Sequence, residues 1–188
     1  MRLRKFRSVS ILTSALAALG LGAALLFGTT PASAATPQQT TAKPASSVTN
    51  YITFYGYVDN SPPGRALAHP GIHQEAGGVG TYANPVTFAE PNDLNGPWCQ
   101  IIYVPFLKKY FIHEDQCDPC GGVNSNHVDL WMGGDSGSTK SPEKAALLNC
   151  EDKWTQHNTI ITSPPNNEPV DTTALFTPPT TCHGGTGD

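Results

Sequence analysis

The stretch FIHEDQCDPCGG at residues 111–122, followed by HVDLWM at residues 127–132, decides the expected fold. Each part is a short apolar run that carries an aspartate, Asp115 in the first and Asp129 in the second. The loop between them is rich in Gly and Asn, which indicates a turn that brings the second run back past the first. We therefore expect two β-strands whose aspartates meet in one cleft, where one carboxyl group can hold a proton while the other stays charged.

Outward from this stretch, the chain alternates between short strands and turns. Residues 48–58 place apolar and polar side chains in turn, which is typical of a strand with one buried face. Further strands are expected at residues 85–89, 101–104, 110–114, 127–132 and 155–161. Residues 141–148, SPEKAALL, predict a short helix, because a serine cap and a proline precede an acidic first turn. The expected fold class is all-β, with six strands, one or two short helices and a central strand at residues 51–58.

The N-terminal residues have the pattern of an export signal. Four basic residues precede an apolar run at residues 11–27, and Ala-Ser-Ala at 32–34 fits a cleavage site. The interpretation is a signal peptide at 1–34, a disordered lead-in rich in Thr and Pro at 35–47, and a single domain with a C-terminal extension at 48–188. An uncleaved membrane anchor is the alternative at the N-terminus. The protein is expected to be secreted.

The net negative charge beyond residue 34 limits which classes of partner are expected. Beyond residue 34 the chain has seven basic and fifteen acidic residues, a formal charge of −8. Nucleic acids and anionic membranes bind through basic clusters, so neither is an expected partner after signal cleavage. The expected state is a monomer.

The five cysteines predict disulfides, because export favours oxidised thiols. Cys117 with Cys120, and Cys150 with Cys182, are the expected pairs, and Cys99 is left over. Spacing alone leaves other pairings open. A zinc site is the alternative, built from His113, Cys117, Cys120 and His127. Only one Cys-x2-Cys pair is present and the histidine spacing fits no usual finger, so no metal and no cofactor are expected.

Candidate site residues lie on both strands of the deciding stretch and on the first strand. Asp115 can be catalytic or can simply cap its loop. Asp129 lies in the middle of a strand, where an aspartate is unfavourable without a functional or hydrogen-bonded role. The residues expected to bind substrate are His127 and Trp131, on the same strand face as Asp129, and Tyr55 and Tyr57, whose rings would form a platform for sugars. Glu114 is expected to face away from Asp115.

The order of several segments resembles the double-psi β-barrel of expansins, rare lipoprotein A and the three-aspartate domain of bacterial wall enzymes. The segments that carry the resemblance are TFYG at 53–56, GTYANPVT at 80–87, IYVP at 102–105, FIHED at 111–115 and HVDLW at 127–131. The resemblance covers about residues 51–134. It implies a six-stranded double-psi barrel in which Asp115 and Asp129 match the acidic residues of the lytic enzymes. Gln-Cys-Asp at 116–118 stands where those enzymes have Thr-Gly-Gly.

Three functions are consistent with these features. The first is a secreted protein of expansin-like type that binds or loosens cell-wall polysaccharide, whether peptidoglycan, cellulose or chitin. The second is a peptidoglycan lytic transglycosylase or glycoside hydrolase, with Asp115 as general acid/base and Asp129 holding charge. The third is a secreted interaction module without catalysis. No basic residue matches the enzymes' site securely, which favours the first.

Overall fold

The computed structural model describes residues 45–91, 97–121 and 126–184. All of them belong to one compact unit, Thr41–Asp188. The expected signal peptide, residues 1–34, and all but the last three residues of the expected lead-in lie outside the described residues. No described helix is long and apolar enough to cross a membrane.

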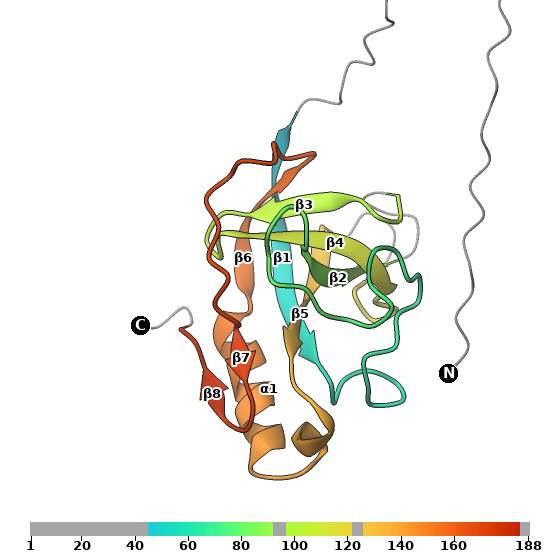
Figure 1. Ribbon diagram of the computed structural model, residues 1–188, viewed down its shortest axis with the longest axis vertical. Coiled ribbons are helices and arrows are strands. Elements are labelled where there is room, and N and C mark those ends of the chain that lie inside the picture. The colour runs from blue at the N-terminus through green and yellow to red at the C-terminus, as the bar shows by residue number, and fades with distance from the viewer. Residues whose placement is uncertain (1–44, 92–96, 122–125, 185–188) are drawn as a thin grey trace, which may run out of the picture. The chain divides into compact units, whose positions relative to one another are not determined.

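Six strands close into one barrel (Figure 1). In chain order they are β1 (Ser46–Gly56), β2 (Val86–Glu90), β3 (Ile101–Val104), β4 (Lys109–Gln116), β5 (His127–Gly133) and β6 (Gln156–Thr162). Around the barrel the order is β1-β5-β2-β4-β3-β6. The β1–β5 and β2–β4 pairs are parallel and the others are antiparallel. The expected six-stranded β-barrel is thus confirmed, and β1 lies between β5 and β6.

The two aspartate strands lie near each other in the barrel but are not direct neighbours. Strand β2 lies between β4 and β5 and pairs with both. Ala89 on β2 is in register with Asp115 on one side and with Asp129 on the other. Since neighbouring strands are about 4.8 Å apart, the two aspartate Cα atoms are roughly 10 Å apart across β2.

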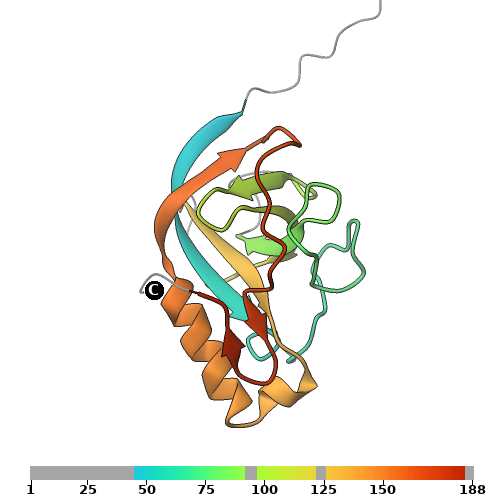
Figure 2. The same cartoon turned by 60° about the vertical axis from the view of Figure 1, so that its left-hand side comes forward.

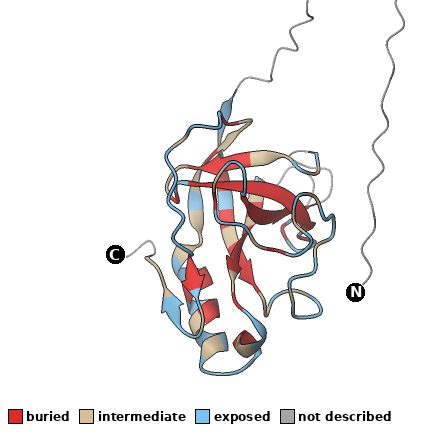
Figure 3. Ribbon diagram, in the orientation of Figure 1, coloured by how far each residue is buried: buried red, intermediate tan, exposed pale blue. Residues whose placement is uncertain are grey.

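Burial is continuous along β2 and most of β4, whereas buried and less buried residues alternate along parts of β1 and β5 (Figure 3). On β1, Ile52 is 0% exposed, whereas the next residue, Thr53, is only half-buried. On β5, Val128 and Leu130 are 1% and 0% exposed, whereas Asp129 between them is only half-buried. Each large aliphatic side chain that is moved out of water contributes about 1.5–3 kcal/mol to folding. The period-2 pattern therefore fixes which face of β1 and β5 turns away from the core.

One α-helix and a small hairpin lie beside one end of the barrel (Figure 2). A 3-10 turn, η1 (Ser136–Thr139), precedes α1 (Glu143–Trp154), and the hairpin consists of β7 (Phe176–Thr177) and β8 (Thr181–Cys182). Pro142 is the N-cap of α1 rather than its first residue, and the helix runs six residues beyond the expected end. The Cys150–Cys182 disulfide joins α1 to β8.

Candidate functional site

The candidate site lies on the outward face of the parallel β1–β5 ladder, which we call the β1–β5 outer face. Its register brings together three cross-strand pairs, Tyr51 with His127, Thr53 with Asp129, and Tyr55 with Trp131. All six of these residues carry a side-chain group that can form hydrogen bonds. The sequence predicted that His127, Asp129 and Trp131 share one strand face, and the register agrees.

Asp115 ends β4 beneath the segment 57–85 and is only 5% exposed. Its Oδ1 accepts the backbone N–H groups of Ala68 and Gln116, each at 3.0 Å. Its Oδ2 accepts the hydroxyl of Tyr55 at 2.9 Å. Burial raises the pKa of Asp115, while these three hydrogen bonds act against that rise. Asp115 is thus a buried carboxyl group whose two oxygens already accept hydrogen bonds from three neighbouring donors.

Asp129 is more open and has fewer hydrogen bonds. Its Oδ1 lies 2.7 Å from the Thr53 hydroxyl oxygen, within hydrogen-bond distance. Burial raises the pKa of Asp129 to about 7, with smaller contributions in the same direction from the charges of Asp59 and Asp115. The structure therefore favours Asp129, not Asp115, as the carboxyl group that holds a proton near neutral pH.

A hydrogen-bonded chain joins Asp129 to His127 through Thr53. The Thr53 Oγ1 atom is 2.9 Å from His127 Nε2, and His127 Nδ1 is 2.9 Å from the carbonyl oxygen of Cys120. That carbonyl can only accept, so Nδ1 carries a hydrogen. Thr53 has one proton, so either Asp129 donates to Thr53 and Thr53 donates to His127, or a doubly protonated His127 donates to Thr53 and Thr53 to Asp129. Burial lowers the pKa of His127, which favours the first arrangement.

The expected tyrosine platform is not open at Tyr55. Tyr55 is 7% exposed, and its ring meets Trp131 edge-on with centroids 5.2 Å apart. Trp131 is 5% exposed, and Tyr57 is half-buried against the hydrophobic core. Arg65 lies over the Trp131 ring at 6.0 Å and donates to the carbonyl oxygen of Gly134. These three aromatic side chains are therefore part of the packing around the site and do not offer a flat, open surface to a ligand.

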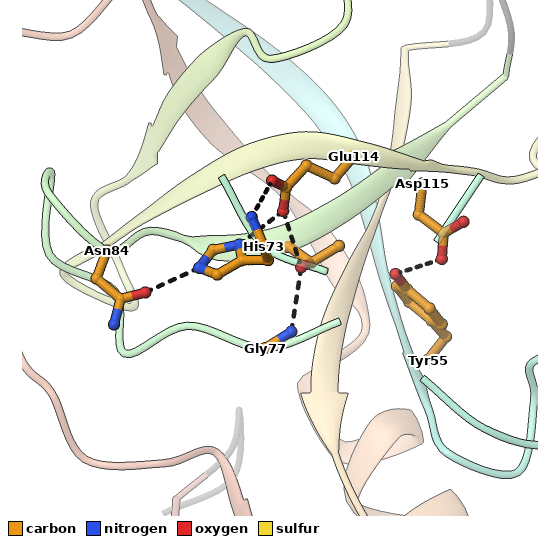
Figure 4. A network of polar contacts seen from close by, with 7 residues as sticks. Tyr55, His73, Gly77, Asn84, Glu114 and Asp115 are labelled. Carbon is orange, nitrogen blue, oxygen red and sulfur yellow. Dashed lines mark hydrogen bonds and ion pairs between the residues drawn. The ribbon is translucent and has the colours of Figure 1, made fainter. Parts of the chain in front are cut away.

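The segment that covers Asp115 is fastened by a second polar network. Glu114, which is 0% exposed, accepts the backbone N–H of His73 at 3.0 Å and the hydroxyl of Thr87 at 3.3 Å. Nδ1 of His73 is 2.7 Å from Glu114, and Nε2 is 2.9 Å from the side-chain oxygen of Asn84. Figure 4 shows Glu114 directed to His73 while Asp115 is directed to Tyr55. Glu114 therefore faces away from Asp115, as expected, and holds the covering segment.

A second acidic pair lies at the end of β1. Glu151 on α1 is 7% exposed, and burial raises its pKa to about 10, with a further contribution from a hydrogen bond to Asp59. Asp59 also accepts the backbone N–H of Gly56 at 2.9 Å. A protonated Glu151 bonded to the Asp59 carboxylate is consistent with both facts. The sequence analysis missed this pair, because no local pattern relates residue 59 to residue 151.

The structure joins the two expected cysteine pairs, Cys117 with Cys120 and Cys150 with Cys182. Cys99 is free, as expected, and it is exposed. Among the described residues, the only side chains that gather like metal ligands are Cys117, Cys120 and Asp129, within 4.8 Å of one another. A disulfide leaves no thiolate for a metal, so this group does not suit zinc. The alternative zinc set is not brought together there.

Three residues of the outer face were not singled out from the sequence as site residues. Thr53 connects the two ends of the proton chain, Tyr51 is 37% exposed, and His157 on β6 packs against Tyr51 with ring centroids 4.8 Å apart. Period-2 alternation around Asp129 could have pointed to the strand face. Only the register between β1, β5 and β6 shows which residues of the other strands join it.

The comparisons with known proteins place the chain in one family. The family described as DDB_G0273701 N-terminal domain matches residues 47–183. A Dictyostelium discoideum protein named "Uncharacterized protein DDB_G0273701/DDB_G0273221" is 41% identical over 137 residues, which cover 69% of this chain and 56% of that protein. This chain thus spans little more than half the length of that relative. No solved structure matches the chain. The matched range contains the whole barrel except Ser46, together with both disulfides, and the chain belongs to the DDB_G0273701 N-terminal domain family.

Proposed function

We propose that this protein is exported and binds or loosens cell-wall polysaccharide along the β1–β5 outer face, as expansin-like proteins do. The observation that carries the proposal is the environment of Asp129. This carboxyl group is half-buried, holds a proton near neutral pH and is joined by Thr53 to an imidazole. A neutral carboxyl group can both donate to and accept from sugar hydroxyls.

The burial of Asp115 favours binding over hydrolysis with two carboxylates. A glycoside hydrolase of the usual kind needs both carboxyl groups against the scissile bond. Asp115 is covered by the segment 57–85 and already accepts three hydrogen bonds, so it does not reach a polymer on the outer face. Its role in the proposal is to fix Tyr55 and the covering segment.

Lytic cleavage by a single acid/base is the second candidate, because Asp129 alone has the required properties. A group with a pKa of about 7 can give a proton to a glycosidic oxygen and take one back. In this candidate Asp129 takes the part that the resemblance implied for Asp115. Detection of new chain ends after incubation with the polymer would separate cleavage from binding.

The double-psi assignment remains part of this proposal. It is supported by the mixed pairing, in which two parallel ladders, β1–β5 and β2–β4, close into one barrel with antiparallel ladders. Export is supported by the basic and apolar N-terminal pattern and by the two disulfides.

The test is a pull-down on insoluble cellulose, chitin and peptidoglycan, followed by product analysis on any polymer that binds. We expect retention on at least one of them and no soluble products. Asp129→Ala should release most of the bound protein, because it removes both the donor and the acceptor that the carboxyl group offers to sugar hydroxyls. Asp152→Ala, at an exposed carboxylate on α1, is the matched control. A parent protein that binds none of the three polymers contradicts the proposal.

A further inference from the structure

We propose that Tyr51, His127 and His157 form a sugar-ring subsite beside Asp129, which we call the ring shelf, and that it takes one pyranose of a straight β-linked chain. This inference rests on the proposed function and adds to it the place and orientation of the polymer. It also replaces Tyr55 and Tyr57 as the expected sugar platform.

The ring shelf is built by register. Tyr51 on β1 pairs with His127 on β5 and with His157 on β6, so the tyrosine lies between two imidazoles. Its ring centroid is 4.9 Å from that of His127 and 4.8 Å from that of His157. These packed side chains restrain one another, so the surface is formed before a ligand arrives.

An open groove of about 550 Å³ lies on the ring shelf. Besides the three rings, its lining includes Cys120 and Asn126. The Tyr51 hydroxyl and the His157 imidazole make no hydrogen bond with the described part of the chain, so both can bond to a ligand. An aromatic surface with polar groups at its edges suits a sugar, whose C–H groups pack on the ring while its hydroxyls find donors and acceptors.

The distance to Asp129 sets the orientation of the polymer. Tyr51 and Thr53 are two residues apart on one strand, about 7 Å along β1. A pyranose held in the groove against Tyr51 therefore lies one outward-facing residue of β1 away from Thr53, and the next ring of the chain would pass Thr53 and Asp129, which lie outside the groove lining. A straight β-linked chain can continue along the strand, whereas an α-linked chain curves away from it.

His127 belongs to both the ring shelf and the proton chain. Its Nδ1 is held by the carbonyl oxygen of Cys120, and its Nε2 bonds to Thr53. A sugar on the shelf therefore touches the imidazole that Thr53 joins to Asp129. Binding should change the imidazole signals of His127 and His157 together.

Titration calorimetry with cellohexaose, chitohexaose and maltohexaose tests the ring shelf. We expect at least one β-linked oligosaccharide to bind better than maltohexaose. Tyr51→Ala should weaken that binding at least tenfold, Tyr51→Phe two- to threefold and His157→Ala about threefold. Tyr82→Ala is the matched control, because Tyr82 is 39% exposed and also packs on a neighbouring ring, that of Tyr110. It should bind like the parent.

Three results would overturn the ring shelf in distinguishable ways. Unchanged affinity in Tyr51→Ala, together with loss of affinity in Asp129→Ala, rejects the shelf and leaves the proposed function standing. A parent protein that binds neither these oligosaccharides nor the insoluble polymers rejects both. If Tyr51→Ala does not fold, the NMR signals of His127 and His157 in the parent decide, and their failure to shift with a bound ligand rejects the shelf.

Discussion

The two ends of the β1–β5 outer face are built on one ladder and differ in what covers them. At one end Tyr51 is 37% exposed beside His127, and at the other Tyr55 and Trp131 are 7% and 5% exposed. The strands are continuous and the side chains are of similar kind. The segment 57–85 makes the difference, since Arg65 lies over Trp131 and Ala68 bonds to Asp115. Accessibility on this face is therefore decided by the connection after β1 rather than by the strand pattern.

The same contrast separates the two aspartates that flank Ala89. Asp115 at the covered end accepts three hydrogen bonds, and Asp129 near the open end has one, which it shares with the Thr53 hydroxyl. Fixed donors favour a charged carboxylate, whereas burial with few donors favours a neutral acid. One residue type thus supports the fold at one end of the face and is available to a ligand at the other.

The largest difference between the ends should appear in stability. Asp115→Ala leaves the donors of Ala68, Gln116 and Tyr55 without their acceptor and should lower the free energy of unfolding by about 3–5 kcal/mol. Asp129→Ala should cost about 1 kcal/mol, because the Thr53 hydroxyl can still donate to His127. Chemical denaturation of the two variants measures both values. Equal losses would mean that the two carboxyl groups are structurally equivalent.

The pH dependence of stability should identify Asp129. Its pKa in the folded protein is about 7, against 3.8 for an ordinary aspartate, so the folded state binds more protons between these values. The stabilisation that Asp129 gives to the folded state is therefore complete below pH 3.8. It is lost as the pH rises to about 7, and the free energy of unfolding falls by up to about 4 kcal/mol over this range. The difference in unfolding free energy between the parent and Asp129→Asn should fall over this window. A flat difference would contradict the raised pKa.

Glu151 provides the control for that measurement, because its own window is wider. Its folded pKa of about 10 and ordinary value of 4.5 place its loss of stability from about pH 4.5 to pH 10. Glu151→Gln should remove the fall in unfolding free energy with pH above pH 7. The fall between pH 3.8 and pH 7 that is due to Asp129 should remain. A slope above pH 7 that survives Glu151→Gln would assign it to another group.

The two disulfides should separate stability from binding. Replacing Cys150 and Cys182 by serine should cost about 3–4 kcal/mol, and replacing Cys117 and Cys120 about 2 kcal/mol, because the first pair closes the longer loop. The order should reverse for oligosaccharide affinity, because Cys120 holds His127 through its carbonyl oxygen. Calorimetry on both double variants tests this, and equal affinities would show that the small loop does not orient His127.

The sequence predicted those parts of the molecule that depend on local pattern. Residues 101–104 match β3, and the apolar alternation placed β1 and β5 within two residues of their ends. The pairing of the strands could not be predicted in the same way. Ala89 separates Asp115 from Asp129 because β2 pairs with both β4 and β5. This pairing joins residues that are far apart in the sequence, so no local pattern predicts it. The burial of Tyr55 depends likewise on a segment whose contacts no periodicity encodes.

The smallest expected effect concerns the fastening of the covering segment. Arg65 donates to the carbonyl oxygen of Gly134 at 3.1 Å and lies over Trp131, but it is exposed, so Arg65→Gln should cost no more than about 1 kcal/mol in global stability. Local opening is a more sensitive measure, since the Ala68 amide bonds to Asp115 only while the segment is closed. We expect faster hydrogen exchange at Ala68 in Arg65→Gln, unchanged exchange in β5, and an intermediate rate in Arg65→Lys, which keeps the charge without the planar guanidinium. Unchanged exchange at Ala68 would mean that the contacts of His73 with Glu114 hold the segment in place without Arg65.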